Sequence, residues 1–63
     1  MSPAELKSAR HALGLSARGM AAAVGVASGR TVRRWERGDR PVPGPVALLV
    51  ARLLSEANRR PAA

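Results

Sequence analysis

Apolar residues recur along this chain at the three- and four-residue spacing of an α-helix, in four runs that glycine, serine and proline separate. The runs cover residues 3–13, 17–24, 28–37 and 45–57. This pattern predicts four short helices, an all-α fold and a single domain over residues 1–58. Residues 59–63 are expected to form a flexible basic tail, with fraying from Asn58 onward.

Local signals mark the ends of the predicted helices. Ser2, Pro3 and Glu5 form a capping box with proline at the first helical position. Serine also precedes the second and third helices, at Ser16 and Ser28, and the last helix has only the weaker cap Gly44 before Pro45. The first three helices are expected to end at glycines, which are Gly14, Gly25 and Gly38.

Gly19 lies inside the second helix, where glycine costs up to about 1 kcal/mol relative to alanine. We interpret it as a position where another stretch of backbone approaches closely.

The third helix has two chemically distinct sides. Val32 and Trp35 are three residues apart and share the side that we expect to face the core. Four arginines fall within roughly a quarter turn on the other side: Arg30, Arg33, Arg34 and Arg37. The major groove of DNA admits a helix, and guanine O6 and N7 accept both arms of a guanidinium. Base contacts are therefore predicted for Arg30, Arg33 and Arg34, with a simply solvated basic surface as the alternative.

Other charged residues have different expected roles. Arg40 follows the third helix in a proline-rich loop, residues 38–45, from which it would reach the sugar–phosphate backbone. Arg10 on the first helix is either a surface residue or a phosphate contact. Glu36 is expected to hydrogen-bond within the fold, to a neighbouring arginine or a helix N-terminus, rather than to a cytosine amino group.

The last helix carries a wider apolar stripe than one small domain needs. Leu48 and Ala51 extend this stripe beyond its core-facing side, which indicates either ordinary surface hydrophobicity or a dimer contact. A chain of 63 residues is marginally stable alone, and a second copy would supplement its core. The predicted dimer interface consists of Leu48, Ala51, Arg52 and Ser55.

Composition favours a polyanionic partner. The net charge is +7, from 11 basic and four acidic residues, and Lys7 is the one basic residue that is not arginine. Arginine suits bidentate contacts, although a GC-rich genome would also enrich it. Nucleic acid is the favoured partner. A cationic membrane-active peptide is disfavoured, because glycine and proline divide the chain into separate short helices.

Catalytic and metal-binding chemistry lacks the residues it needs. The chain has one histidine, one aspartate and no cysteine, so we expect no enzyme activity, no metal, no cofactor and no disulfide. Neither a bilayer-spanning apolar run nor a signal-peptide pattern is present. A soluble, cytoplasmic and nucleoid-associated protein without a membrane partner is therefore expected.

The ordered motifs resemble the Cro/C1-type (XRE) helix-turn-helix family over residues 5–54. The motifs are Leu13-Gly14-Leu15-Ser16, Met20-Ala21, Val24-Gly25, Val32 and Trp35-Glu36-Arg37-Gly38, with a proline shortly after. The resemblance implies a compact four-helix, lambda-repressor-like domain whose third helix enters the major groove. It also implies sequence-specific binding of double-stranded DNA by a homodimer on a palindromic operator, commonly for repression.

The same resemblance assigns roles to individual residues. Ser28 would cap the recognition helix, residues 28–37, and Gly29 would join the arginines on its groove-facing side. Phosphate contacts are expected from Ser16, Arg18, Ser28, Thr31, Arg37 and Arg40.

Two features depart from the family pattern. The turn at residues 26–31 is about one residue longer than usual, which places the register in the groove in question. The chain has four predicted helices, whereas many members have a fifth that builds the dimer. A narrower likeness is to small phage and mobile-element autorepressors, including regulators associated with anti-CRISPR genes. Another is to antitoxins, in which the same fold binds a protein partner and represses its own operon.

Overall fold

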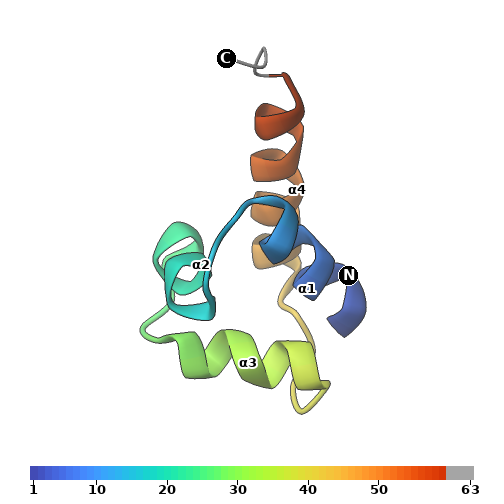
Figure 1. Ribbon diagram of the computed structural model, residues 1–63. Coiled ribbons are helices and arrows are strands. Elements are labelled where there is room, and N and C mark those ends of the chain that lie inside the picture. Colours follow the sequence, from blue (N-terminus) through green and yellow to red (C-terminus); the bar gives the residue numbers. More distant parts are fainter. Residues whose placement is uncertain (60–63) are drawn as a thin grey trace.

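The computed structural model describes residues 1–59, which form four α-helices and no strand. The helices are α1 (Pro3–Ala12), α2 (Ala17–Val24), α3 (Gly29–Arg37) and α4 (Gly44–Arg59) (Figure 1). The predicted all-α fold with four helices is therefore confirmed.

The capping signals act as the sequence predicts at α1 and α2. The Ser2 backbone N–H donates to Glu5 Oε1 at 2.9 Å, and the Glu5 N–H donates to Ser2 Oγ at 3.1 Å. The hydrogen bond with the Ser2 backbone holds the pKa of Glu5 below its usual value. Ser16 Oγ accepts from the Gly19 N–H at 3.0 Å. Each helix thus begins with one orphan backbone donor satisfied by its own serine.

Three helix-end predictions need correction. Ser28 occupies the N-cap position of α3, but its side chain makes no capping hydrogen bond. Gly44 is the first residue of α4 rather than its cap. Asn58 and Arg59 belong to α4, because no helix breaker precedes them in the run that follows Pro45. The rest of the predicted tail, residues 60–63, lies outside the described residues.

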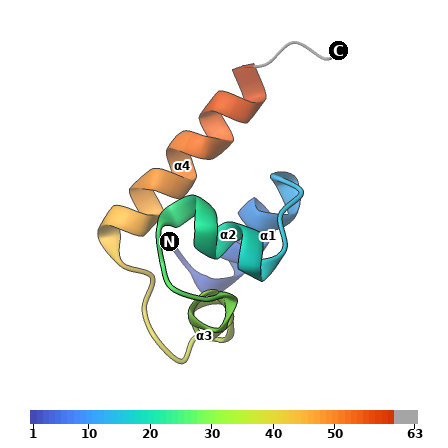
Figure 2. The same cartoon turned by 90° about the vertical axis from the view of Figure 1, so that its left-hand side faces the viewer.

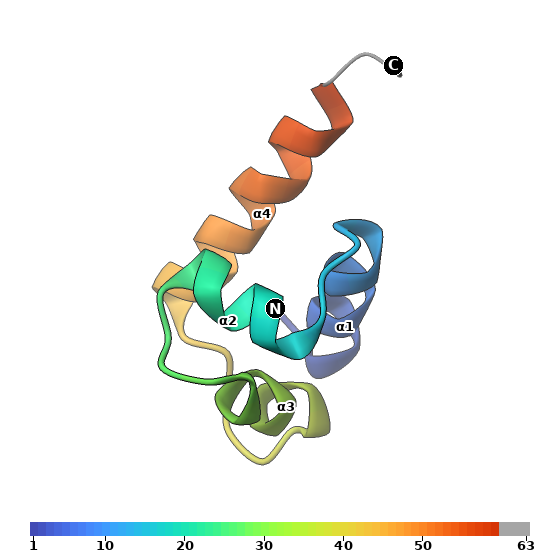
Figure 3. The same ribbon diagram turned by 60° about the vertical axis from the view of Figure 1, so that its left-hand side comes forward.

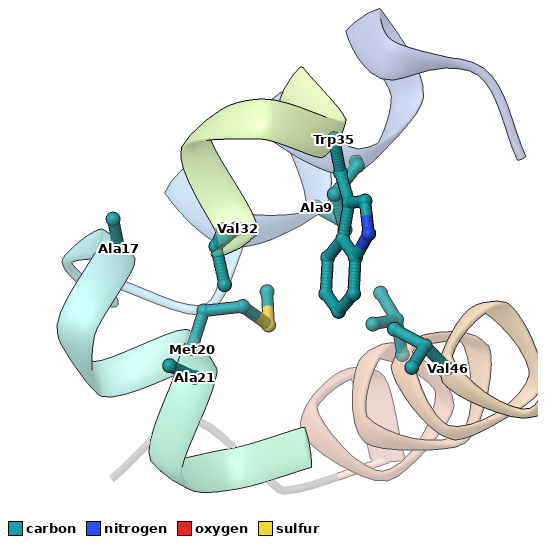
Figure 4. Close-up of a cluster of buried hydrophobic side chains, with 9 residues drawn as sticks. Ala9, Ala17, Met20, Ala21, Val32, Trp35 and Val46 are labelled. Atoms are coloured by element: carbon teal, nitrogen blue, oxygen red, sulfur yellow. The ribbon is translucent and has the colours of Figure 1, made fainter. Parts of the chain in front are cut away.

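All four helices contribute to one apolar core. Its buried residues are Leu6, Ala9, Ala17, Met20, Ala21, Val32, Trp35, Val46 and Val50. The Trp35 ring extends from α3 between Ala9 of α1 and Val46 of α4, with Val32 and Met20 nearby (Figure 4). Only 5% of Trp35 is exposed, which confirms that it is a core residue.

The long helix α4 runs from the core towards the end of the molecule that lies away from α3 (Figure 1). Its N-terminal half covers the core, and its C-terminal half extends away from α3 (Figures 1 and 3). The α3 helix lies at the opposite end, next to α2, so its outer side is not covered by another helix. The fold therefore leaves the arginine-bearing side of α3 open.

Close backbone contact occurs at Gly29, not at Gly19 as the sequence interpretation proposed. A Cβ on Gly29 would lie 2.9 Å from the Arg18 backbone nitrogen and 3.1 Å from the Ala17 carbonyl carbon. A Cβ on Gly19 would instead meet the Ser16 hydroxyl at 3.3 Å and the Leu15 side chain at 3.5 Å. The first turn of α3 thus rests directly on the backbone at the start of α2, which requires a residue without a side chain.

Gly29→Ala is expected to destabilise the fold by about 1–3 kcal/mol, because two backbones must separate to admit the methyl group. Gly19→Ala is the matched control, since a Cβ there meets only side chains, at 3.3 Å and beyond, and no backbone. That change should alter stability by less than about 1 kcal/mol, because alanine also has the higher helix propensity. Urea unfolding followed by circular dichroism measures both, and equal stability of the two variants would contradict the close contact.

Candidate nucleic-acid interface

The two sides of α3 are fully separated in the structure. Val32 is completely buried and Trp35 nearly so, which fixes the helix to the core. Its four arginines are all exposed: Arg30, Arg33, Arg34 and Arg37. The helix therefore presents a cluster of guanidinium groups to solvent while its other side anchors it.

Three of these guanidiniums have no carboxylate partner among residues 1–59. The ion pairs in that range are Arg10–Glu36 and Arg37–Asp39. The second pair joins Arg37 Nε to Asp39 Oδ2 at 3.2 Å between side chains that are 64% and 56% exposed. Such an exposed pair is worth about 0–1 kcal/mol and exchanges readily. Arg37 is thus partly neutralised, whereas Arg30, Arg33 and Arg34 keep their full charge.

A surface hollow of about 580 Å³ lies between α3 and α2, and we call it the α2-side hollow. Its arginines are Arg18 at the start of α2 and Arg30 and Arg33 of α3. The remaining lining residues are small or apolar: Ala21, Ala22, Val26, Ala27, Ser28 and Gly29. Four of the residues predicted to contact DNA, on two helices and the turn between them, therefore lie around one concave surface.

A second hollow of about 520 Å³ lies beside α3 where the chain turns towards α4, and we call it the loop-side hollow. Its polar lining consists of Thr31, Arg34 and Arg40. Trp35, Pro41 and Pro43 form its apolar walls. The edge of the core tryptophan thus reaches a basic surface pocket, and the proline-rich loop holds Arg40 next to Arg34.

The remaining predicted residues lie elsewhere. Ser16 is exposed at the start of α2, outside both hollows, with its hydroxyl oxygen accepting from Gly19. The predicted dimer residues are exposed on α4: Leu48, Ala51, Arg52 and Ser55. Leu48 is 69% exposed, which makes it the most exposed large apolar side chain among residues 1–59.

The ion pair between Arg10 and Glu36 is largely buried and lies on the core side of α3. Arg10 Nε and Nη2 donate to the two carboxylate oxygens of Glu36 at 2.7 and 3.0 Å. The third arm, Nη1, donates to the Leu15 carbonyl at 3.1 Å. The hydrogen bonds with Glu36 raise the pKa of Arg10 further above its ordinary value. Arg10 thereby joins α1, α3 and the segment that leads into α2.

The internal hydrogen bond predicted for Glu36 is confirmed, and its partner is an arginine. The structure disfavours the phosphate contact for Arg10, because each of its three guanidinium nitrogens donates one hydrogen bond within the fold and its side chain is only 16% exposed. The sequence held one signal for this role, since Arg10 lies on the same side of α1 as Leu6 and Leu13.

A family model described as a helix-turn-helix domain matches residues 4–57. The chain belongs to this family. In this helix-turn-helix domain, α2, the turn at residues 25–28 and α3 form the motif, with α3 as its second helix. The match agrees with the resemblance to Cro/C1-type (XRE) proteins, and it indicates a DNA-binding regulator. Neither the search of curated proteins nor that of solved structures yielded a match.

Residues 1–59 of this helix-turn-helix domain contain neither a candidate metal site nor a candidate membrane span. Residues 1–59 contain no group of three or more His, Cys, Asp or Glu side chains that could hold a metal ion. No helix in the same range combines the length and hydrophobicity that a bilayer crossing requires.

Glu36→Ala is expected to lower the free energy of unfolding by about 1.5–3 kcal/mol, because it leaves a shielded guanidinium without its acceptor. Asp39→Ala is the matched control, since it breaks the exposed ion pair and should cost about 0–1 kcal/mol. Thermal unfolding of both variants measures the difference. A similar loss of stability in the two variants would show that the Arg10–Glu36 pair contributes no more than the exposed pair.

Proposed function

We propose that this protein is a sequence-specific regulator of transcription that binds double-stranded DNA as a homodimer and inserts α3 into the major groove. The observation that carries the proposal is that α3 has one apolar, buried side and one basic, exposed side. Val32 and Trp35 hold the helix to the core, while Arg30, Arg33 and Arg34 are exposed without a carboxylate partner among residues 1–59.

In this proposal the arginines of α3 read bases. Guanine offers two acceptors in the major groove that match the guanidinium fork, so Arg30, Arg33 and Arg34 would favour guanine-containing sites. Contacts to phosphates would position the helix without reading sequence. These contacts are assigned to Ser16, Arg18, Ser28, Thr31, Arg37 and Arg40, which flank α3 or lie at its ends.

Repression follows as the regulatory outcome, by occupation of a palindromic operator, and the regulated operon would include the gene for this protein. The exposed surface of α4 that includes Leu48 and Arg52 supplies the dimer contact in this scheme. A two-fold dimer presents two copies of α3 and therefore calls for two equivalent half-sites. No step of this function is catalytic.

An antitoxin-type module is the alternative, in which the surface of α4 that includes the 69% exposed Leu48 contacts a protein partner. In that case a second, different protein would cover the same surface. Co-purification of one partner at an equimolar ratio would support the alternative, whereas a stable homodimer supports the primary proposal.

Selection of bound duplexes from a random pool tests the primary proposal. The expected result is a palindromic consensus whose half-sites lie about one helical turn apart, roughly 34–36 Å. The outcome opposed to the proposal is enrichment of no sequence at all, which would reduce the arginine cluster to a non-specific polyanion contact.

Arg33→Ala and Arg34→Ala should each weaken binding to the selected duplex by about 1–3 kcal/mol while changing binding to random duplexes much less. Arg40→Ala should weaken both kinds of binding alike and reduce the salt slope of log K by about 0.9. Fluorescence anisotropy at several salt concentrations measures these quantities. Uniform losses for all three variants would show that the base readers are wrongly assigned.

A further inference from the structure

The geometry points to a division of labour between two neighbouring residues: Arg33 and Arg34 contact opposite strands of the duplex. This inference rests on the proposed insertion of α3 into the major groove and adds the orientation of the helix between the two backbones. It identifies the α2-side hollow as the seat of one sugar–phosphate backbone and the loop-side hollow as the seat of the other.

The arginines of α3 leave the helix in different directions around its axis. At about 100° per residue, the middle of the exposed side runs through Arg30 and Arg37. Arg33 then lies about 50° to one side of that line and Arg34 about 50° to the other. Two residues adjacent in sequence therefore leave the helix in clearly different directions.

The two hollows separate Arg33 from Arg34. Arg33 lines the α2-side hollow and Arg34 lines the loop-side hollow, and the two hollows share no lining residue. Figure 2 looks along α3 and shows α2 above it and the loop that leads to α4 beside it. Each hollow thus has its own wall, made by a different segment of the chain.

The major groove is about as wide as an α-helix with its side chains. An α-helix with its side chains is about 10–12 Å across, and the major groove is about 12 Å wide. A helix that fills the groove places both of its flanks against phosphate-bearing walls. Each flank of α3 carries one further arginine for such a wall, Arg18 on the α2 side and Arg40 on the loop side.

The chemistry of the loop-side hollow suits a backbone nucleotide. Arg40 and the Thr31 hydroxyl are donors for phosphate oxygens, while Pro41 and Pro43 offer an apolar surface to the deoxyribose. Arg40 is placed to bind the phosphate, and Arg34 to reach past it to a base of the same strand. On the other flank, Arg18 and Arg33 have the corresponding roles towards the second strand.

The test crosses protein variants with duplexes altered in one strand. The selected duplex is prepared in three forms: unmodified, and with uncharged methylphosphonates in one or the other strand of each half-site. On the unmodified duplex, Arg18→Ala and Arg40→Ala should each lower the salt slope by about 0.9. When one particular strand is neutralised, Arg18→Ala should cause no further loss of affinity. When the opposite strand is neutralised, Arg40→Ala should cause none.

A second set of duplexes tests the base contacts. Here 7-deazapurines replace the purines of one strand in each half-site, at positions related by the two-fold axis, which removes the N7 acceptor that a guanidinium uses and leaves O6. Arg33→Ala should lose about 5- to 150-fold in affinity on the unmodified duplex, and clearly less on the duplex altered in the strand that Arg18 faces. Arg34→Ala should behave in the same way with the strand assigned to Arg40.

Arg59→Ala is the control, since it removes the same charge from the end of α4 that lies away from α3 (Figure 1). It should show the same small effect on every duplex. The inference would be overturned if changes in both hollows responded to alteration of the same strand, or if each responded equally to alteration of either strand. The proposed function would remain intact in both cases. Failure of the unaltered protein to prefer any duplex would instead overturn the proposed function, and the inference with it.

Discussion

Trp35 is the largest apolar side chain in a core built mainly from alanine and valine, and it comes from the helix that also carries the exposed arginines. A buried aromatic side chain removes about 150–250 Å² from water, worth roughly 4–6 kcal/mol as an upper estimate. The core of so small a domain supplies a net stability of only about 3–5 kcal/mol. The position of α3 and the existence of the fold therefore depend on the same contact, and the outer side of α3 cannot be repositioned without loss of the core.

The distribution of acidic residues preserves the charge on that outer side. Two of the four acids are engaged away from that side, Glu5 in the α1 capping box and Glu36 with Arg10, and among residues 1–59 only Asp39 pairs with one of its arginines, Arg37. Few carboxylates are left to neutralise the arginines of α3. Mutual repulsion of those arginines disfavours the folded state, and a bound polyanion would relieve it. A ligand that binds only the folded protein also stabilises it by mass action, so DNA would strengthen a marginal fold.

The sequence predicted those features that depend on neighbouring residues. The serine caps of α1 and α2, the glycines that end α2 and α3 and the two sides of α3 all follow from residues within one or two turns. It failed where residues distant in sequence meet. The Arg10–Glu36 pair spans 26 positions, and the contact of Gly29 with the start of α2 depends on how two helices cross. Neither relation has a local signature, which is why the close approach was assigned to the wrong glycine.

The two features that the sequence did not predict act on the same part of the molecule. Arg10 holds the Leu15 carbonyl, directly before α2, while its other two arms hold Glu36 on α3. Gly29 brings the first turn of α3 onto the backbone of Ala17 and Arg18. One polar and one steric contact therefore fix the start of α2 against α3 independently. A binding site needs its contacting groups within about 0.5 Å of their productive positions, and rigid elements achieve this better than loops. The spacing between Arg18 at the start of α2 and the arginines of α3 is thus set by contacts inside the fold.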